Sequence, residues 1–249
     1  MSQETSPGGS TIYRYQDPSD PSPQISGVYA REIQAHFDQA FPDRQHFAIH
    51  VPDASPIDVH ILPPKEKDGY YVIYTSGMSD LPMTLPPDID EPEKWQYAEL
   101  YMFLPPTWQF GLPEDDRLSN KRSKGQFPPQ YHWPVTLLRF LGQFPHAYKT
   151  WLGWGHTMPN GPSYAPICEG ATMGGVVLDI IRGVPPMETR DGKRVNFFFV
   201  IPAYKEEIEY KLKYGMKALT DRFAEGDLPL VVDIRRPNLC PDFKEVLDG

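Results

Sequence analysis

The sequence predicts an α+β fold, in which helices pack on a mixed, largely antiparallel β-sheet. Segments with strand patterns follow one another in runs, and segments with helical spacing interrupt them only at intervals. We find neither an internal repeat nor a heptad pattern in the 249 residues. Strands and helices do not alternate strictly, as they would around a parallel sheet, and this favours the α+β class.

The first regular element expected from the sequence is a helix. Residues 1–24 are rich in Pro, Ser and Gly and contain few large apolar side chains, so we expect a disordered lead. One domain is then expected over residues 25–249. Ser26 is a suitable N-cap for a helix that runs to about Ala40. Apolar side chains recur there at three- and four-residue steps.

Four strands are expected next, because the segments alternate apolar and polar residues or are rich in β-branched and aromatic ones. They are His46–Val51, Ile57–Leu62, Tyr70–Thr75 and Trp95–Leu104. The following segment, Leu112–Gln130, is polar, charged and flanked by prolines, which predicts a long surface loop or insertion.

The second half of the chain predicts two helices and three strands. Pro134 suits the first turn of a helix, and Asp191-Gly192 is typical of a tight hairpin turn between Met187 and the strand after it. The expected elements are a helix from Pro134 to about Pro145, strands at Gly174–Ile181 and Val195–Ile201, a long helix at Ala203–Glu225 and a strand at Leu230–Ile234.

Composition excludes several kinds of partner. A net charge of -9 argues against nucleic-acid binding, and it suits a basic protein partner or simply keeps the chain soluble. No apolar run is long enough to span a membrane, and the N-terminus lacks the pattern of a secretory signal. Cys168 and Cys240 have no metal-type spacing, so we expect free thiols in a reducing cytoplasm, with a disulfide between them as the alternative.

The segment Thr150–Pro162, TWLGWGHTMPNGP, predicts a structured loop, which we call the Trp–Gly loop. Its glycines allow unusual backbone angles, and its tryptophans are too large and apolar to be left in a mobile loop. Trp151, Trp154 and His156 either contact a partner or brace the loop against the core.

A search for catalytic patterns finds only weak candidates. Asp58 and His60 are two residues apart on a predicted strand and share a face. With His50 and His156 they are candidates for a metal or acid–base site, or they are ordinary hydrogen-bonded side chains. Ser76 or Ser79 could be proposed as a nucleophile, but the GxSxG pattern lacks its final glycine. We therefore expect no metal and no cofactor.

The segment TSGMSDLPM follows a predicted strand directly. Its glycine allows a sharp turn, Asp80 can accept bonds from nearby backbone amides, and Met78 offers an adaptable apolar contact. The segment is either part of a partner surface or a structural corner.

Six strings together resemble the Suppressor of fused family, in order and spacing, from about Ile25 to Asp233. They are DVHI at Asp58–Ile61, YYVIYTSGMSDLPM at Tyr70–Met83, AELYMFLPPTW at Ala98–Trp108, WPVTLLRFLGQFPH at Trp133–His146, TWLGWGHTMPNG at Thr150–Gly161 and VNFFFVIPAYKEEIEYKLKYG at Val195–Gly215.

The resemblance implies a non-enzymatic, cytoplasmic protein-binding domain. The animal protein of this family is a negative regulator that binds a transcription factor. The chain is similar to stand-alone bacterial members, some of which resemble immunity proteins or antitoxins. We therefore expect an immunity protein whose acidic surface meets a basic toxin domain. The expected contact residues are Asp58, His60, Met78, Asp80, Trp151, Trp154 and His156.

Two alternatives stay open at this point. A regulatory adaptor would hold a peptide by strand addition at an exposed sheet edge. A metal-dependent or acid–base enzyme would use Asp58, His60 and His156, and it requires these side chains to converge in one pocket.

Overall fold

The computed structural model describes the chain except residues 1, 16–17, 19–24, 52–54, 66–68, 112–127, 181–182 and 244–249. The predicted loop at Leu112–Gln130 lies almost entirely outside the described residues, as does the side chain of His50. No described helix is long and apolar enough to cross a membrane. Cys168 and Cys240 are free thiols, as predicted.

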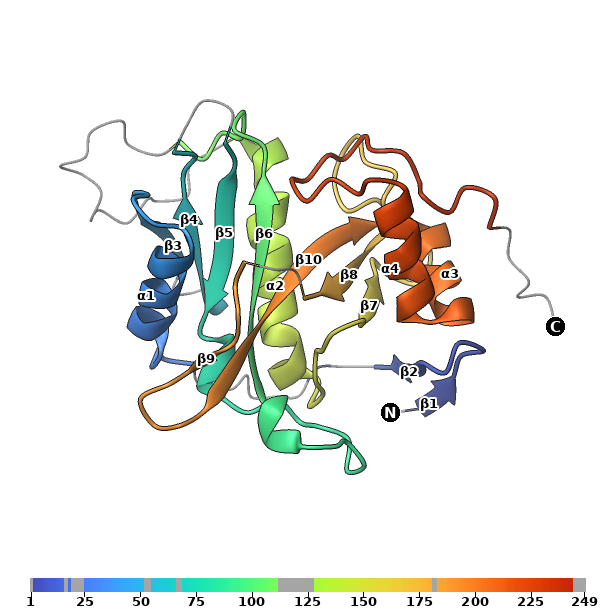
Figure 1. The fold of residues 1–249 in the computed structure, drawn as a ribbon, viewed down its shortest axis with the longest axis horizontal. Helices are drawn as coiled ribbons and strands as arrows, with labels where there is room; N and C mark the ends of the chain where they lie inside the picture. Colours follow the sequence, from blue (N-terminus) through green and yellow to red (C-terminus); the bar gives the residue numbers. More distant parts are fainter. Residues whose placement is uncertain are drawn as a thin grey trace.

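The centre of the molecule is an eight-stranded sheet with the order β3-β4-β5-β6-β10-β8-β7, and β9 pairs beside the start of β10 (Figure 1). The pair β6–β10 is parallel and the other pairs are antiparallel, which confirms the predicted mixed, largely antiparallel sheet. The strands are β3 Phe47–Val51, β4 Ser55–Leu62, β5 Tyr71–Ser76, β6 Tyr97–Leu104, β7 Thr157–Pro159, β8 Gly175–Asp179, β9 Met187–Glu188 and β10 Arg194–Ala203.

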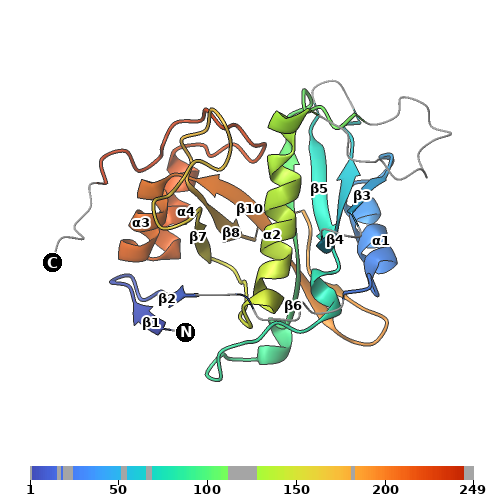
Figure 2. The same ribbon diagram turned by 180° about the vertical axis from the view of Figure 1, so that it is seen from behind.

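Helices cover both faces of this sheet. Figures 1 and 2 show α1 (Ala30–Ala40) on one face and α2 (Trp133–Ala147) on the other, while α3 (Lys205–Tyr214) and α4 (Met216–Glu225) lie at the β7 end. In the described part of the chain, short 3-10 turns also occur at η1 (Met78–Asp80), η2 (Pro92–Lys94) and η4 (Pro129–Tyr131).

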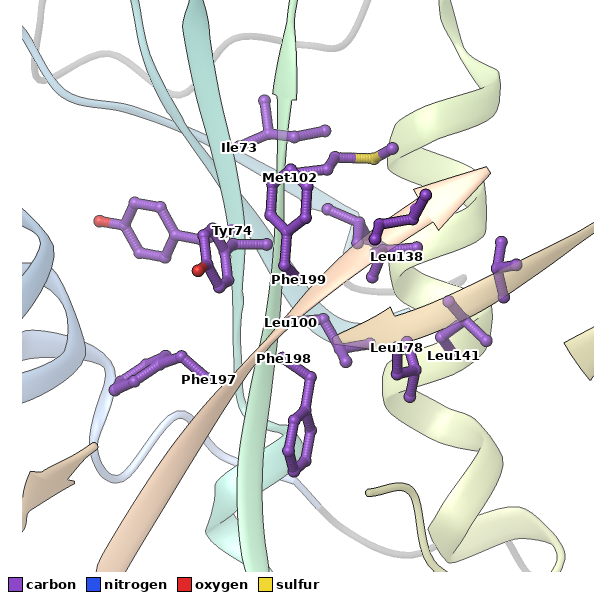
Figure 3. Close-up of a cluster of buried hydrophobic side chains, with 14 of the residues drawn as sticks. Ile73, Tyr74, Leu100, Met102, Leu138, Leu141, Leu178, Phe197, Phe198 and Phe199 are labelled. Atoms are coloured by element: carbon purple, nitrogen blue, oxygen red, sulfur yellow. The ribbon is translucent and has the colours of Figure 1, made fainter. Parts of the chain in front are cut away.

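The core fills the space between the sheet and its helices (Figure 3). Tyr74 of β5 stacks on Phe37 of α1 with ring centroids 3.7 Å apart, and Phe197 of β10 meets Phe37 edge-on at 5.2 Å. Leu138 and Leu141 of α2 are fully buried on the opposite side of the sheet. Burial on both faces explains why the central strands are apolar nearly throughout.

Two predicted helices differ from those observed. The first begins at Ala30, because Gly27 has φ 72°, which is not a helical conformation. The backbone amides of Ser26 and Gly27 both donate to Asp80 Oδ2, at 2.8 and 2.6 Å. The predicted helix at Ala203–Glu225 is two helices, separated at Gly215, where the backbone has φ 87° and ψ 167°. These angles are open almost only to glycine.

Three smaller differences concern the ends of the chain and one helix boundary. The helix α2 continues through Pro145 to Ala147. The predicted strand at Leu230–Ile234 contributes only a single bridge, between Phe103 and Val231. Within the predicted disordered lead, β1 (Ser2–Thr5) and β2 (Thr11–Arg14) form an antiparallel hairpin.

The C-terminal segment returns across α3 and is held there by a buried ion pair. Arg236 and Glu207 are 4% and 0% exposed, and their two nitrogen–oxygen contacts are both 2.6 Å long. Glu207 also accepts from the amides of Tyr204 and Leu239, and Arg236 also donates to the carbonyl of Pro202. The pair thus joins three segments of the chain at the start of α3.

Candidate functional site

The predicted site residue His60 belongs to a buried polar chain between β4 and β5. Its Nε2 lies 2.7 Å from Ser76 Oγ, and its Nδ1 lies 2.8 Å from His46 Nε2. The imidazole also stacks on Tyr74 at 4.7 Å. Burial, together with the smaller effect of the neighbouring His46, lowers the pKa of His60 to about 3. The ring is therefore neutral at physiological pH.

The order Ser76–His60–His46 has the connectivity of an activated nucleophile, but not its setting. Ser76 is 1% exposed, so its hydroxyl is closed to a substrate in this conformation. The nearby backbone amides of Gly77 and Ser79 already donate to Glu99, so they are not free to bind an oxyanion. A base with so low a pKa is also poorly matched to neutral pH. The hydrogen-bonded series Ser76–His60–His46 therefore has a structural role, which is to hold β4 and β5 together.

Glu99 of β6 organises the turn after β5. Its Oε1 accepts from the amides of Gly77 and Ser79 and from the Ser79 hydroxyl, at 3.1, 2.9 and 2.6 Å, and its Oε2 accepts from Thr75 Oγ1 at 2.6 Å. Burial raises the pKa of Glu99 to about 7 against the effect of these donors. Gly77 has φ 106°, and a Cβ there would lie 2.8 Å from Ile25.

Met78 and Asp80 occupy this same turn, and both have contacts within the fold. Met78 is fully buried, and its carbonyl accepts from His146 Nε2 at 2.8 Å. Asp80 is half-buried and holds the segment before α1 through Ser26 and Gly27. The motif SGMSDLPM is thus a corner that ties β5, β6, α1 and α2 together.

Asp58, His60 and His156 do not converge, which overturns the enzyme alternative built on them. Asp58 and His60 lie on β4, and His156 immediately precedes β7, five steps away in the sheet order. At about 4.8 Å per strand the separation is about 24 Å. Among the described residues, no group of three or more His, Cys, Asp or Glu side chains could hold a metal ion.

The Trp–Gly loop is braced by its own aromatic side chains. The rings of Trp151 and His156 meet edge-on at 4.4 Å, and a Cβ on Gly153 would lie 2.6 Å from the Trp151 ring. Burial, together with the smaller effect of the nearby Lys211, lowers the pKa of His156 to about 4. Lys211 itself is buried, and burial lowers its pKa to about 8.

Trp154 is the most open of the predicted contact residues. Its side chain is 48% exposed, and its indole Nε1 donates to Asp179 Oδ1 at 2.8 Å. The same carboxylate oxygen accepts from the amide of Ile180, also at 2.8 Å, and Ile180 is 49% exposed. One carboxylate oxygen therefore holds both the Trp154 indole and the backbone of Ile180. We call Trp154, Asp179 and Ile180 the tryptophan patch.

Sequence reasoning missed two residues that organise these clusters. Glu99 lies within the apolar strand AELYMFL, and a lone carboxylate in such a strand needs buried donors, so this signal was present. His46 precedes β3, and no local pattern indicates that its ring would reach His60.

The family model for Suppressor of fused protein (SUFU) matches residues 53–237, and the chain belongs to this family. A search of curated protein sequences returns no match.

Solved structures share this fold at low sequence identity. A protein described as a SUFU homolog from Neisseria gonorrhoeae FA 1090 is 15% identical with a TM-score of 0.59, over 85% of this chain and 96% of that one. A chain in the crystal structure of the Sufu–Fu complex is 15% identical with a TM-score of 0.56, over 87% of this chain and 93% of that one. Drosophila Suppressor of Fused is 16% identical with a TM-score of 0.53. That match covers 91% of this chain and 52% of the Drosophila chain.

Proposed function

We propose that this chain is a non-enzymatic, cytoplasmic protein-binding domain that neutralises a toxin as an immunity protein. The observation that carries the proposal is the tryptophan patch. Tryptophan is enriched among residues that dominate binding energy, and a side chain already fixed by Asp179 loses little freedom when a partner covers it. The solved complex of the relative Sufu with Fu supports a role in protein binding.

Charge supports a basic partner. With a net charge of -9, the chain would attract a basic toxin domain and speed its association, more at low salt than at high salt. Of the seven expected contact residues, His60 and Met78 are buried in this fold. We therefore propose that these two residues stabilise the fold, and that Trp154 makes direct contact with the partner.

The test begins with a pull-down from the native host, with mass spectrometry to identify the partner. A toxin partner should be stoichiometric, and co-expression of this chain should protect cells from it. Trp154→Ala should then weaken binding by about 30-fold, as expected for a central aromatic anchor. The matched control is Leu230→Ala, which truncates a side chain that is 45% exposed elsewhere. Failure to protect cells, or equal affinities for the two variants, would contradict the proposal.

A regulatory adaptor that adds a peptide strand to the sheet is the second candidate. In the described part of the chain, β3 pairs with β4 alone, so its other edge presents backbone groups suited to strand addition. Amide hydrogen exchange of the complex separates the two candidates. Protection confined to Phe47–Val51 would favour the adaptor, and protection around Trp154 would favour the immunity protein.

A further inference from the structure

The N-terminal hairpin lies outside residues 53–237, the part of the chain that matches the family model. Its strands β1 and β2 pair only with each other and lie apart from the large sheet, near the end of α3 (Figures 1 and 2). An isolated two-stranded hairpin is marginally stable in water. Its position therefore depends on contacts with the rest of the molecule.

The first of these contacts is made by the hairpin turn. The amide of Gly8 donates to the carbonyl of Leu212, near the C-terminal end of α3, at 2.7 Å. A Cβ at this position would lie 2.7 Å from both the Leu212 oxygen and the Gly215 nitrogen. The turn is thus fitted closely against the point where α3 and α4 separate.

The second contact is a tyrosine inserted at the end of α2. The ring of Tyr15 meets Phe144 edge-on at 5.1 Å and Tyr148 at 5.5 Å. Its hydroxyl lies 2.5 Å from Thr150 Oγ1. Thr150 is 3% exposed, and its carbonyl accepts from the amide of Thr84 at 2.9 Å, so its position is fixed. We call Phe144, Tyr148 and Thr150 the tyrosine site.

The aromatic surface of α2 extends beyond the area that Tyr15 covers. The ring of Phe140, one turn earlier in α2, lies 5.8 Å from that of Phe144, and its side chain is 49% exposed. A segment with a tyrosine and a neighbouring apolar residue would cover both rings, whereas Tyr15 leaves Phe140 open. Thr150 also begins the Trp–Gly loop, which carries Trp154, so the tyrosine site adjoins the tryptophan patch in sequence.

We propose that the tyrosine site binds a tyrosine-bearing extended segment of a partner protein, and that residues 2–15 occupy it in the free chain as an internal competitor. The proposal rests on the proposed protein-binding function and names a second contact for the same partner. An internal competitor lowers the apparent affinity by the fraction of molecules in which the site is free. Removing the competitor should therefore raise affinity without adding any contact.

The test uses the full chain and a labelled synthetic peptide with the sequence of Glu4–Tyr15, followed by fluorescence anisotropy. Tyr15→Ala should bind the peptide at least about tenfold more tightly than the unaltered chain. The matched control is Arg14→Ala, which alters an exposed neighbour and leaves the site occupied. Tyr15→Phe keeps the ring packing but loses the contact with Thr150, so it should bind the peptide several-fold more tightly and serves if Tyr15→Ala does not fold.

A second peptide, in which alanine replaces the final tyrosine, tests whether binding requires the tyrosine side chain. It should bind at least about tenfold more weakly to Tyr15→Ala, since the ring and hydroxyl supply most of the contact. Equal binding of the two peptides, or equal affinity of all chain variants, would overturn the proposal. Dimers of the unaltered chain that Tyr15→Ala abolishes would assign the occupant to a second copy and also overturn it. Because the peptide is the chain's own, these outcomes leave the immunity proposal to its separate test.

Discussion

Removal of Arg236 should destabilise the fold more than removal of any exposed charge. In Arg236→Met the carboxylate of Glu207, which is 0% exposed, would keep the amides of Tyr204 and Leu239 but lose its cation. The carbonyl of Pro202 would lose a donor as well. Breaking a buried pair by removing one partner costs about 3–5 kcal/mol of unfolding free energy. This is a large fraction of the total stability of an ordinary domain, about 5–15 kcal/mol.

Urea unfolding followed by tryptophan fluorescence measures this loss. The control is Lys217→Met, which removes one partner of an exposed pair with Asp221 and should leave the urea midpoint unchanged within error. The double variant Arg236→Met/Glu207→Gln should recover part of the loss, because it no longer buries an unpaired charge. A loss below about 1 kcal/mol in Arg236→Met, or no recovery in the double variant, would refute the reasoning.

Three further predictions concern single residues. The pKa of His60 is about 3 in the folded protein and about 6.5 in the unfolded chain, so between these pH values only the unfolded chain binds a proton at this side chain. The stability of the unaltered chain relative to His60→Gln should therefore fall by about 2 kcal/mol from pH 7 to pH 5, measured by urea unfolding, and a constant difference would contradict this. Gly215→Ala should cost about 1–3 kcal/mol in the same assay, because φ is 87° there; a loss below about 0.5 kcal/mol would be inconsistent with that backbone. In thiol labelling of the native chain, Cys168 should react well before Cys240, which is 4% exposed and whose pKa burial raises to about 11; equal rates would argue against this packing.

The strands were predictable because their side-chain patterns arise from burial in the sheet itself. Tyr70–Thr75 and Val195–Ile201 were both expected within a few residues of β5 and β10. The break at Gly215 was missed because the apolar stripe continues through it, and a single glycine is tolerated inside many helices. The spacing of apolar residues indicates which face of a helix is buried, but it does not indicate that the helix breaks at Gly215.

The sequence identified the segments that form the candidate site, but it did not indicate which residues contact one another there. The sequence indicated that Trp154 lies in a structured loop, but Asp179, which fixes its indole, is on β8 and carries no local signal. Composition predicted a disordered N-terminal lead, whereas Tyr15 and Gly8 hold the hairpin through residues more than a hundred positions away. Such long-range contacts are set by tertiary packing, which local propensity does not encode.

The parallel pairing of β6 with β10 has a consequence for the order of folding. Strands β3 to β6 are successive antiparallel neighbours, so their contacts close short loops and can form early. The strand β10 joins them through β6, where Val195 pairs with Tyr97, 98 positions earlier. Closing that long loop costs entropy before the contact forms, so we expect β10 docking to limit the folding rate. During synthesis, the edge of β6 in the β3–β6 meander would therefore stay unpaired and exposed until the ribosome had released the residues that form β10.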